Sequence, residues 1–179
     1  MNFLRLMGEG FCVCVASALL SPATSEAQAT TVSTEYLMTL YAPLEASQEI
    51  DSSLEVNNVR PGGWVKGPRI KGTLLAPAGD WSRILPSGVA RVDVRATIKT
   101  DDGALIYISY NGIFKDSEET EARAIKGEVL TSKDMYFVIA PTMQTSAKKY
   151  DWLNGVQCIG KMVGYKNDSY VKYDIFVVR

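Results

Sequence analysis

The sequence predicts a single antiparallel β-barrel of about eight strands with one or two short helices, formed by residues 30–179. Beyond residue 30, segments rich in β-branched and aromatic residues recur at short spacing, and clusters of Gly, Pro, Asn and Asp separate them. Strands do not alternate with helical patterns, as they would in a parallel sheet. An antiparallel sandwich would show the same spacing, but a chain of about 150 residues suits a closed barrel with room for one small ligand.

Seven segments are predicted to be strands: residues 36–42, 64–75, 89–99, 104–112, 135–141, 156–164 and 170–179. A short helix is predicted at 116–127, because Asp116 and Ser117 precede two glutamates and Gly127 can end a helix. This helix has few apolar residues, so we expect it on the surface or across a barrel mouth. A second helical turn is predicted at 150–155.

Residues 92–112, VDVRATIKTDDGALIYISYNG, predict a hairpin whose loop sets the register of its strands. The segment Thr100–Ala104 suits a three-residue loop, with Gly103 in the left-handed conformation. This loop places Val94 opposite Tyr110 on an apolar face that we expect to be buried. The other face is polar and pairs Thr97 with Tyr107, Arg95 with Ser109, and Asp93 with Asn111.

The polar face of this hairpin has two interpretations. In one, it is solvated, and Asp93 and Arg95 form a weak surface ion pair. In the other, it lines the barrel lumen, where Asp93 orients the Arg95 guanidinium to bind an anionic or carbonyl group. There Tyr107, Ser109 and Asn111 would add hydrogen-bond donors. Composition alone does not decide between the two.

Composition excludes several classes of function. Hydrophobic residues make up 46% and charged residues 22% of the 179 residues, as in ordinary globular proteins. The 19 basic and 20 acidic residues form no basic cluster, so no nucleic-acid partner is expected. Histidine is absent, which excludes Ser-His-Asp and Cys-His catalysis and His-ligated zinc. We expect no metal and no cofactor, and any proton transfer would use a carboxylate, Tyr, Lys or Cys.

Residues 1–29 resemble an export signal that is removed after Ala29. The apolar run FCVCVASALL is too short to span a bilayer, and the mature chain carries no predicted membrane span. Glu9 departs from the usual signal composition, and an N-terminal extension without export is the alternative. Cleavage would leave Cys158 alone, without an internal disulfide, in a strand-like context that predicts a buried apolar thiol. We therefore expect a periplasmic or secreted protein.

Three segments of the chain resemble the domain of unknown function 3237 family, over roughly residues 35–179. The most specific are GDW at 79–81, the hairpin VDVR…TDDGALIY, and YDWLN at 150–154. The resemblance implies a small barrel similar to lipocalin-type barrels and no assigned activity. Its recurring polar and aromatic positions fall on Asp80, Trp81, Asp93, Arg95, Asp102, Tyr150, Trp152 and Asn154. Retention of Asp and Arg on the hairpin favours the orientation into the lumen.

The chain departs from the pattern of this family at two positions. Family members tend to carry Arg and Glu where this chain has Val138 and Gln144. Residues six apart share a face if one strand runs through both. If the Arg and the Glu form one ion pair in family members, both charges are expected to be lost together, because a buried charge without its partner is costly. The export signal is a further departure.

Other candidate residues have simpler interpretations. Asp101-Asp102-Gly103 lacks the rest of a calcium loop and is interpreted as a turn. Asp80 is expected to satisfy backbone donors in a loop, with a catalytic role as the alternative. The tryptophans Trp64, Trp81 and Trp152 are expected in the core or plugging the barrel, with a pocket-lining role as the alternative.

Three hypotheses for function remain open. The first is a binding barrel for a small, partly apolar ligand that bears a carbonyl or carboxylate group. Its candidate ligand-binding residues are Arg95, Asp93, Tyr107, Ser109, Asn111, Trp64, Trp81, Gln144 and Trp152. The second is a cofactor-independent lyase, isomerase or cyclase, with Asp93 or Asp80 as base, Tyr107 as acid and Arg95 stabilising negative charge. The third is a structural or interaction barrel with a filled interior. Pairing into a homodimer is compatible with a barrel of this size.

Overall fold

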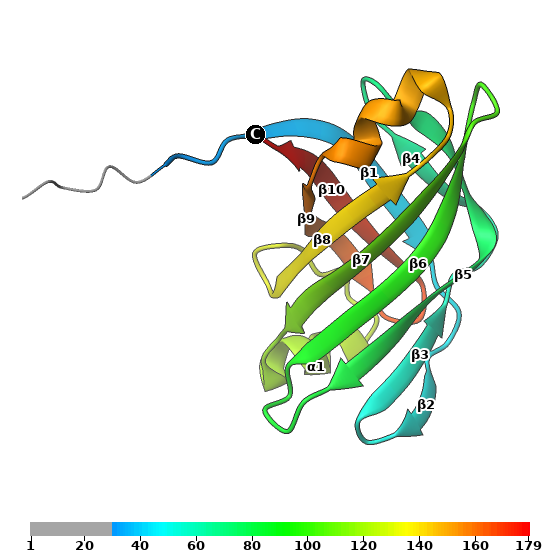
Figure 1. Cartoon of the computed structure of the whole chain (residues 1–179). Coiled ribbons are helices and arrows are strands. Elements are labelled where there is room, and N and C mark those ends of the chain that lie inside the picture. Colours follow the sequence, from blue (N-terminus) through cyan, green and yellow to red (C-terminus); the bar gives the residue numbers. More distant parts are fainter. Residues whose placement is uncertain (1–29) are drawn as a thin grey trace, which may run out of the picture. The chain divides into compact units, whose positions relative to one another are not determined.

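Eight strands form a closed antiparallel barrel in the computed structural model, which describes residues 30–179 (Figure 1). In barrel order they are β5 (Lys71–Ile84), β4 (Gly63–Lys66), β1 (Thr34–Pro43), β10 (Tyr170–Val178), β9 (Cys158–Lys166), β8 (Tyr136–Gln144), β7 (Leu105–Lys115) and β6 (Ala90–Thr100). Pairing of β6 with β5 closes the barrel. The hairpin of β2 (Gln48–Asp51) and β3 (Leu54–Asn58) extends the sheet beside β5. The predicted fold class is confirmed.

Strand β5 is long because it pairs with two other strands in succession. Its first residues pair with β4, and its second half, from Gly79 to Arg83, pairs with β3. A register shift between Leu75 and Gly79 separates the halves along β6. The prediction of one strand over 64–75 was wrong, since a bend after Lys66 divides it into β4 and the start of β5. Strands β2 and β3 were not predicted because they are short and mostly polar.

The hairpin of β6 and β7 has the predicted register at every position. Val94 lies opposite Tyr110, and Arg95 lies opposite Ser109. Gly103 in the loop has a φ of 87°, which a residue with a Cβ rarely adopts. The side chains of β6 alternate strictly, with Val92, Val94, Ala96, Ile98 and Thr100 buried on the inner face. The apolar face of this hairpin is therefore the inner wall of the barrel.

The two ends of the barrel differ. Helix η1 (Lys148–Gly155), orange in Figure 1, covers one end and buries Tyr150 and Leu153 against the core. Helix α1 (Glu118–Ile125) lies at the opposite end (Figure 1). Ser117 caps it by accepting a hydrogen bond from the Thr120 N–H. Both predicted helices are confirmed, including the position of α1 at a barrel mouth.

Asp102, in the loop between β6 and β7, ties η1 to the barrel. Its carboxylate accepts hydrogen bonds from Thr100 Oγ1 at 2.5 Å and from the Tyr150 hydroxyl at 3.1 Å, and it pairs with the Lys149 ammonium. These contacts, with the Lys149 hydrogen bond contributing most, hold the pKa of Asp102 well below its ordinary value. Asp101-Asp102-Gly103 is thus a turn, as predicted, with an added anchoring role.

Asp102→Asn is expected to lower the melting temperature at neutral pH, because the charged contact with Lys149 is lost. The lowered folded-state pKa means that ionised Asp102 stabilises the fold above its ordinary value of 3.8 and that this contribution disappears as pH falls through the folded value. Thermal melts over a pH series should therefore show the two proteins converging in strong acid. Asp101→Asn in the same loop is the control and should melt like wild type. A gap of constant size at every pH would contradict the assignment.

Two predictions concern the N-terminal segment and the cysteines. The signal sequence and its cleavage after Ala29 lie outside the described residues, so export stays a prediction. Cys158 is buried and free, as predicted, and burial raises the pKa of its thiol. Within residues 30–179, no helix combines the length and apolar character needed to cross a bilayer.

Candidate functional site

A cavity of about 740 Å³ occupies the half of the barrel next to α1. The walls come from the inner faces of β5, β6, β7, β8 and β10, from the ends of β1 and β9, and from β3, while α1 and the turn between β9 and β10 border the mouth. This volume lies within the usual range of about 300–1,000 Å³ for small-molecule sites. The other half of the lumen is packed, with Ile98, Ile106, Ile108, Met162 and Ile175 fully buried. The interior of the barrel is therefore not wholly filled.

Asp80 is the carboxylate in the wall of this cavity. It lies in the second half of β5 and not in a loop as predicted, and it lines the lumen together with Ser82 and Ile84. The Ser82 hydroxyl donates to it at 2.7 Å, and the Asp93 N–H donates at 2.9 Å, so the expected role toward a backbone donor is confirmed. Burial raises the pKa of Asp80, although these two hydrogen bonds oppose the shift.

Two tyrosines present polar groups to the same cavity. Tyr110 is 7% exposed and Tyr173 is 2% exposed, and both line the cavity. Within residues 30–179 neither hydroxyl takes part in a hydrogen bond with another protein group, yet no enclosed side-chain oxygen or nitrogen is left unpaired. Both hydroxyls must therefore border open space, which for these buried residues is the cavity. A ligand would meet two uncommitted hydroxyl groups there.

The pairing of strands brings Asp80 and Tyr110 together. Val94 on β6 lies opposite Asp80 on one side and opposite Tyr110 on the other, so the three share one row across the inner wall. Burial raises the pKa of Tyr110 far above its usual range, and the charge of Asp80 adds to this. Burial also raises the pKa of Tyr173, with smaller contributions from Tyr110 and Asp80. Both tyrosines thus stay protonated and act as donors near a carboxylate.

Aromatic rings form a continuous part of the cavity wall. Tyr110 packs edge-on against Tyr173 at 6.0 Å between ring centroids, and Tyr173 against Phe137 at 5.2 Å. Phe137 continues to Phe114 at 5.1 Å, and Phe114 to Tyr165 at 6.3 Å. All five rings line the cavity. This wall would suit a ligand with a flat apolar body.

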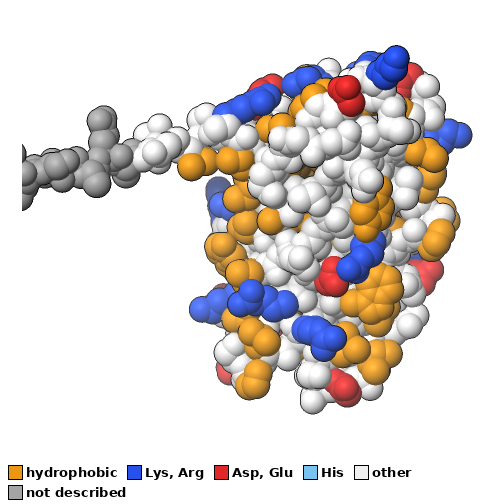
Figure 2. All heavy atoms as spheres, viewed as in Figure 1, with side chains coloured by type: hydrophobic (Ala, Val, Ile, Leu, Met, Phe, Trp, Pro, Cys, Tyr) orange, Lys and Arg blue, Asp and Glu red, His pale blue; other side chains and the backbone are white. Residues whose placement is uncertain are grey.

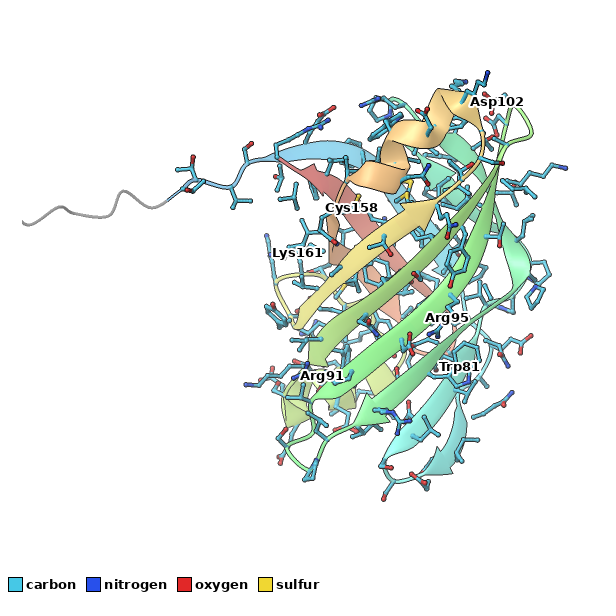
Figure 3. The ribbon with its side chains drawn as sticks, viewed as in Figure 1. Trp81, Arg91, Arg95, Asp102, Cys158 and Lys161 are labelled. Atoms are coloured by element: carbon cyan, nitrogen blue, oxygen red, sulfur yellow. The ribbon has the colours of Figure 1, made fainter. Side chains whose placement is uncertain are left out.

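The predicted orientation of the polar hairpin face into the lumen is wrong. Asp93 and Arg95 form an ion pair of 3.0 Å on the outer wall, with side chains 42% and 53% exposed. Figure 3 shows Arg95 on the outer side of β6, and Figure 2 shows charged and hydrophobic side chains interspersed over this face. Tyr107 and Asn111 are exposed on the same side, and Ser109 contacts Thr142 at 3.3 Å. The reason is hydrophobic burial, because the opposite face of the hairpin is apolar.

The three tryptophans and Gln144 also lie outside the cavity. Trp64 stacks on Tyr41 with ring centroids 5.4 Å apart, and the Arg69 guanidinium lies 3.7 Å above the ring of Trp152. Trp81 is 45% exposed on the outer wall (Figure 3). Gln144 is exposed at the end of β8. Val138 and Gln144 share the outer face of β8, as their spacing predicted.

Among the predicted site residues, all of which lie within residues 30–179, only Asp80 lines the cavity. Tyr110 and Tyr173 were missed because they stand in apolar, inward-facing series. A tyrosine at an inward position of such a strand could have identified them, because a buried tyrosine hydroxyl needs a hydrogen-bond partner. Residues 30–179 contain no group of three or more Cys, Asp or Glu side chains placed to hold a metal ion.

Comparisons with known proteins agree with this architecture. A UPF0311 protein of Rhodopseudomonas palustris is 29% identical over 126 residues, which cover 69% of this chain and 82% of that protein. The crystal structure of a conserved protein of unknown function from Rhodopseudomonas palustris has a TM-score of 0.75 and 26% identity over 84% of this chain and all of that chain. A β-barrel-like protein of Acinetobacter baumannii has a TM-score of 0.69 and 27% identity over 86% of this chain and all of that chain.

The family assignment follows from a match over nearly the whole barrel. The profile of the family described as protein of unknown function DUF3237 matches residues 32–178. This range begins just before β1 and ends with β10, so it includes every strand that closes the barrel and every wall of the cavity. The chain belongs to the DUF3237 family.

Proposed function

We propose that this protein binds a small, largely apolar molecule in the barrel cavity. Asp80 and the hydroxyls of Tyr110 and Tyr173 hold the polar group of the ligand, and the aromatic wall packs its apolar part. The observation that carries the proposal is the pair of buried tyrosine hydroxyls that border the cavity without a partner. Hydroxyl donors that border an open cavity beside a carboxylate are free to bind the polar group of a ligand.

Filling the cavity is expected to abolish binding without unfolding the barrel. Val171 on β10 is buried and lines the cavity, so Val171→Phe would occupy space that a ligand needs. A neutral dye whose fluorescence increases in apolar surroundings, N-phenylnaphthylamine, serves as the probe. Its affinity should fall at least about tenfold, which corresponds to about 1.4 kcal/mol.

Val178→Phe is the matched control, because Val178 lies on the outward face of the same strand. It should bind the dye like wild type. Thermal melts of both variants verify that the barrel is folded. The proposal fails if wild type does not bind the dye, or if a folded Val171→Phe protein binds it with wild-type affinity.

A second candidate is a cofactor-independent lyase, isomerase or cyclase, and one observation favours it. Burial makes Asp80 a stronger base than an ordinary aspartate, and the protonated hydroxyls of Tyr110 and Tyr173 lie in the same cavity. Asp80 would remove a proton next to a carbonyl group, and the hydroxyls would donate to the enolate oxygen. The roles first considered for Asp93, Tyr107 and Arg95 do not apply, because these side chains lie on the outer wall.

This candidate predicts exchange of a carbon-bound proton. β-Tetralone in deuterated buffer should exchange its acidic C–H protons faster with the protein than without it, as followed by NMR. Exchange should increase with pH as Asp80 loses its proton, and Asp80→Asn should reduce it to the rate in buffer. Equal rates for wild type and Asp80→Asn would exclude Asp80 as the base and leave the binding role.

A further inference from the structure

The cavity is strongly acidic although the chain is nearly neutral. Its lining includes six carboxylate side chains and one ammonium group, Lys115, whereas the whole chain has a formal net charge of −1. The carboxylates come from separate elements: Glu55 on β3, Asp80 on β5, Asp116 before α1, Glu118 and Glu121 on α1, and Asp168 between β9 and β10. A concave site lined by charge of one sign concentrates ligands of the opposite sign.

The interior of the cavity adds independent observations that indicate a ligand. The hydroxyls of Tyr110 and Tyr173 make no hydrogen bond to another group among the described residues, and both residues line the cavity while more than nine-tenths buried. Asp80 lies in the same wall, and within residues 30–179 it accepts two hydrogen bonds, from Ser82 and from the Asp93 N–H. A carboxylate has room for further donors. The acidic mouth and the uncommitted groups thus belong to one site.

The aromatic wall also favours a positive charge. The connected rings of Tyr110, Tyr173, Phe137, Phe114 and Tyr165 line the same cavity as Asp80. Aromatic faces attract ammonium groups, most strongly when the cation is removed from water. An anionic ligand would face the opposite situation. Its carboxylate would be desolvated beside Asp80, and the lining residues in the described part of the chain offer it no guanidinium and one ammonium, that of Lys115.

We propose that the ligand of this cavity is an organic cation, a protonated amine carried on an aromatic or otherwise apolar body. The ammonium group pairs with Asp80 and lies near Tyr110 and Tyr173, and the body packs on the remaining rings. The proposal rests on the proposed binding function and names its ligand class. It replaces the carbonyl- or carboxylate-bearing ligand expected from the sequence, because the arginine of that expectation, Arg95, lies on the outer wall.

Three probes with the same ring system test this inference on the full chain: naphthylethylamine, naphthylethanol and naphthylacetate. Their affinities are measured by calorimetry at neutral pH. The amine should bind at least about tenfold more tightly than the alcohol, and the acetate more weakly than both. Binding of the alcohol reports on the cavity itself. If the alcohol binds but the amine has no advantage, or the acetate binds best, the cation proposal is overturned and the binding function stands. If none binds, both fail.

Matched variants assign the preference to Asp80. Asp80→Asn should weaken amine binding by about thirtyfold and leave alcohol binding within about threefold of wild type, because only the ammonium loses its partner. Asp93→Asn removes an exposed carboxylate from the neighbouring strand and should leave both affinities unchanged. A preference for the amine that survives Asp80→Asn would overturn the assignment.

Helix α1 offers a test of the acidic mouth. Glu118 and Glu121 line the cavity and Glu119 does not. The double variant Glu118→Gln, Glu121→Gln should slow association of the amine about threefold at low salt, with little effect at high salt. Glu119→Gln, an exposed residue of the same helix, should associate like wild type. Identical association rates for the double variant and wild type at low salt would show that the carboxylates of α1 do not attract the amine.

Discussion

Gly67→Ala is expected to destabilise the barrel severely. A Cβ at Gly67 would lie 2.0 Å from the carbonyl oxygen of Leu37 and 2.7 Å from the Cα of Met38. Both are backbone atoms of β1, at the point where its pairing with β10 shifts register, so no side chain can rotate away. Overpacking against backbone atoms costs about 3 kcal/mol, a large part of the stability of a typical domain. The melting temperature should fall by about 10 °C or the protein should fail to accumulate in soluble form.

Gly155→Ala is the matched control for this substitution. A Cβ at Gly155 meets no atom within 4 Å, and this residue is exposed at the end of η1. The variant should therefore melt within about 2 °C of wild type. Circular dichroism melts of the three proteins make the comparison. A Gly67→Ala protein as stable as the Gly155→Ala protein would show that β1 and the segment after β4 are not packed as closely as described.

Asp80→Asn is expected to stabilise the protein at neutral pH while removing its preference for amines. Asparagine can keep the hydrogen bond from the Asp93 N–H and a contact with Ser82. It removes a carboxylate that burial disfavours in its charged form. Substitutions that relieve such a functional group commonly gain about 1 kcal/mol, or about 2–4 °C in a domain of this size.

The pH dependence of this gain has a definite sign. The folded-state pKa of Asp80 is raised above the ordinary value of 3.8, so the folded protein holds this proton more tightly than the unfolded chain. Stability is therefore lost as pH rises from that value through the folded-state pKa. The advantage of Asp80→Asn should be complete above this window and vanish in acid. Asp93→Asn should show no such gain, and a lower melting temperature for Asp80→Asn at neutral pH would contradict a burial cost at Asp80.

Much of the fold could be predicted because its signals are local. The loop at Thr100–Ala104 sets the register of β6 and β7, and every predicted pairing is present. Helix α1 lies between Ser117 and Gly127, as expected, and Gly127 is in the left-handed region at a φ of 77°. The period-two pattern also assigned the residues of this hairpin correctly to an apolar and a polar face. Burial of the apolar face then decided which one points inward, and the resemblance to other proteins favoured the wrong choice.

The candidate site was only partly predictable because its members depend on long-range pairing. The segment before Asp80 contains Pro77 and Gly79 and resembles a loop, but it is an irregular part of β5. Such irregularities re-aim the side chains that follow. A shift of the β5 register by one residue would turn Asp80 from the lumen to the solvent. The residues around Asp80 do not indicate which register β5 adopts.

Turn length, alternation and capping act between neighbours along the chain. The residues alone were therefore enough to predict the strand-rich barrel, the register of its central hairpin, the caps of α1 and the burial of Cys158. The open half of the lumen, and the presence of Asp80, Tyr110 and Tyr173 together in it, depend instead on how the strands assemble. These residues lie on β5, β7 and β10 and come together only when the barrel closes between β5 and β6. Closure and the register shift in β5 are properties of the whole sheet, so the chemistry of the cavity appears only in the folded chain.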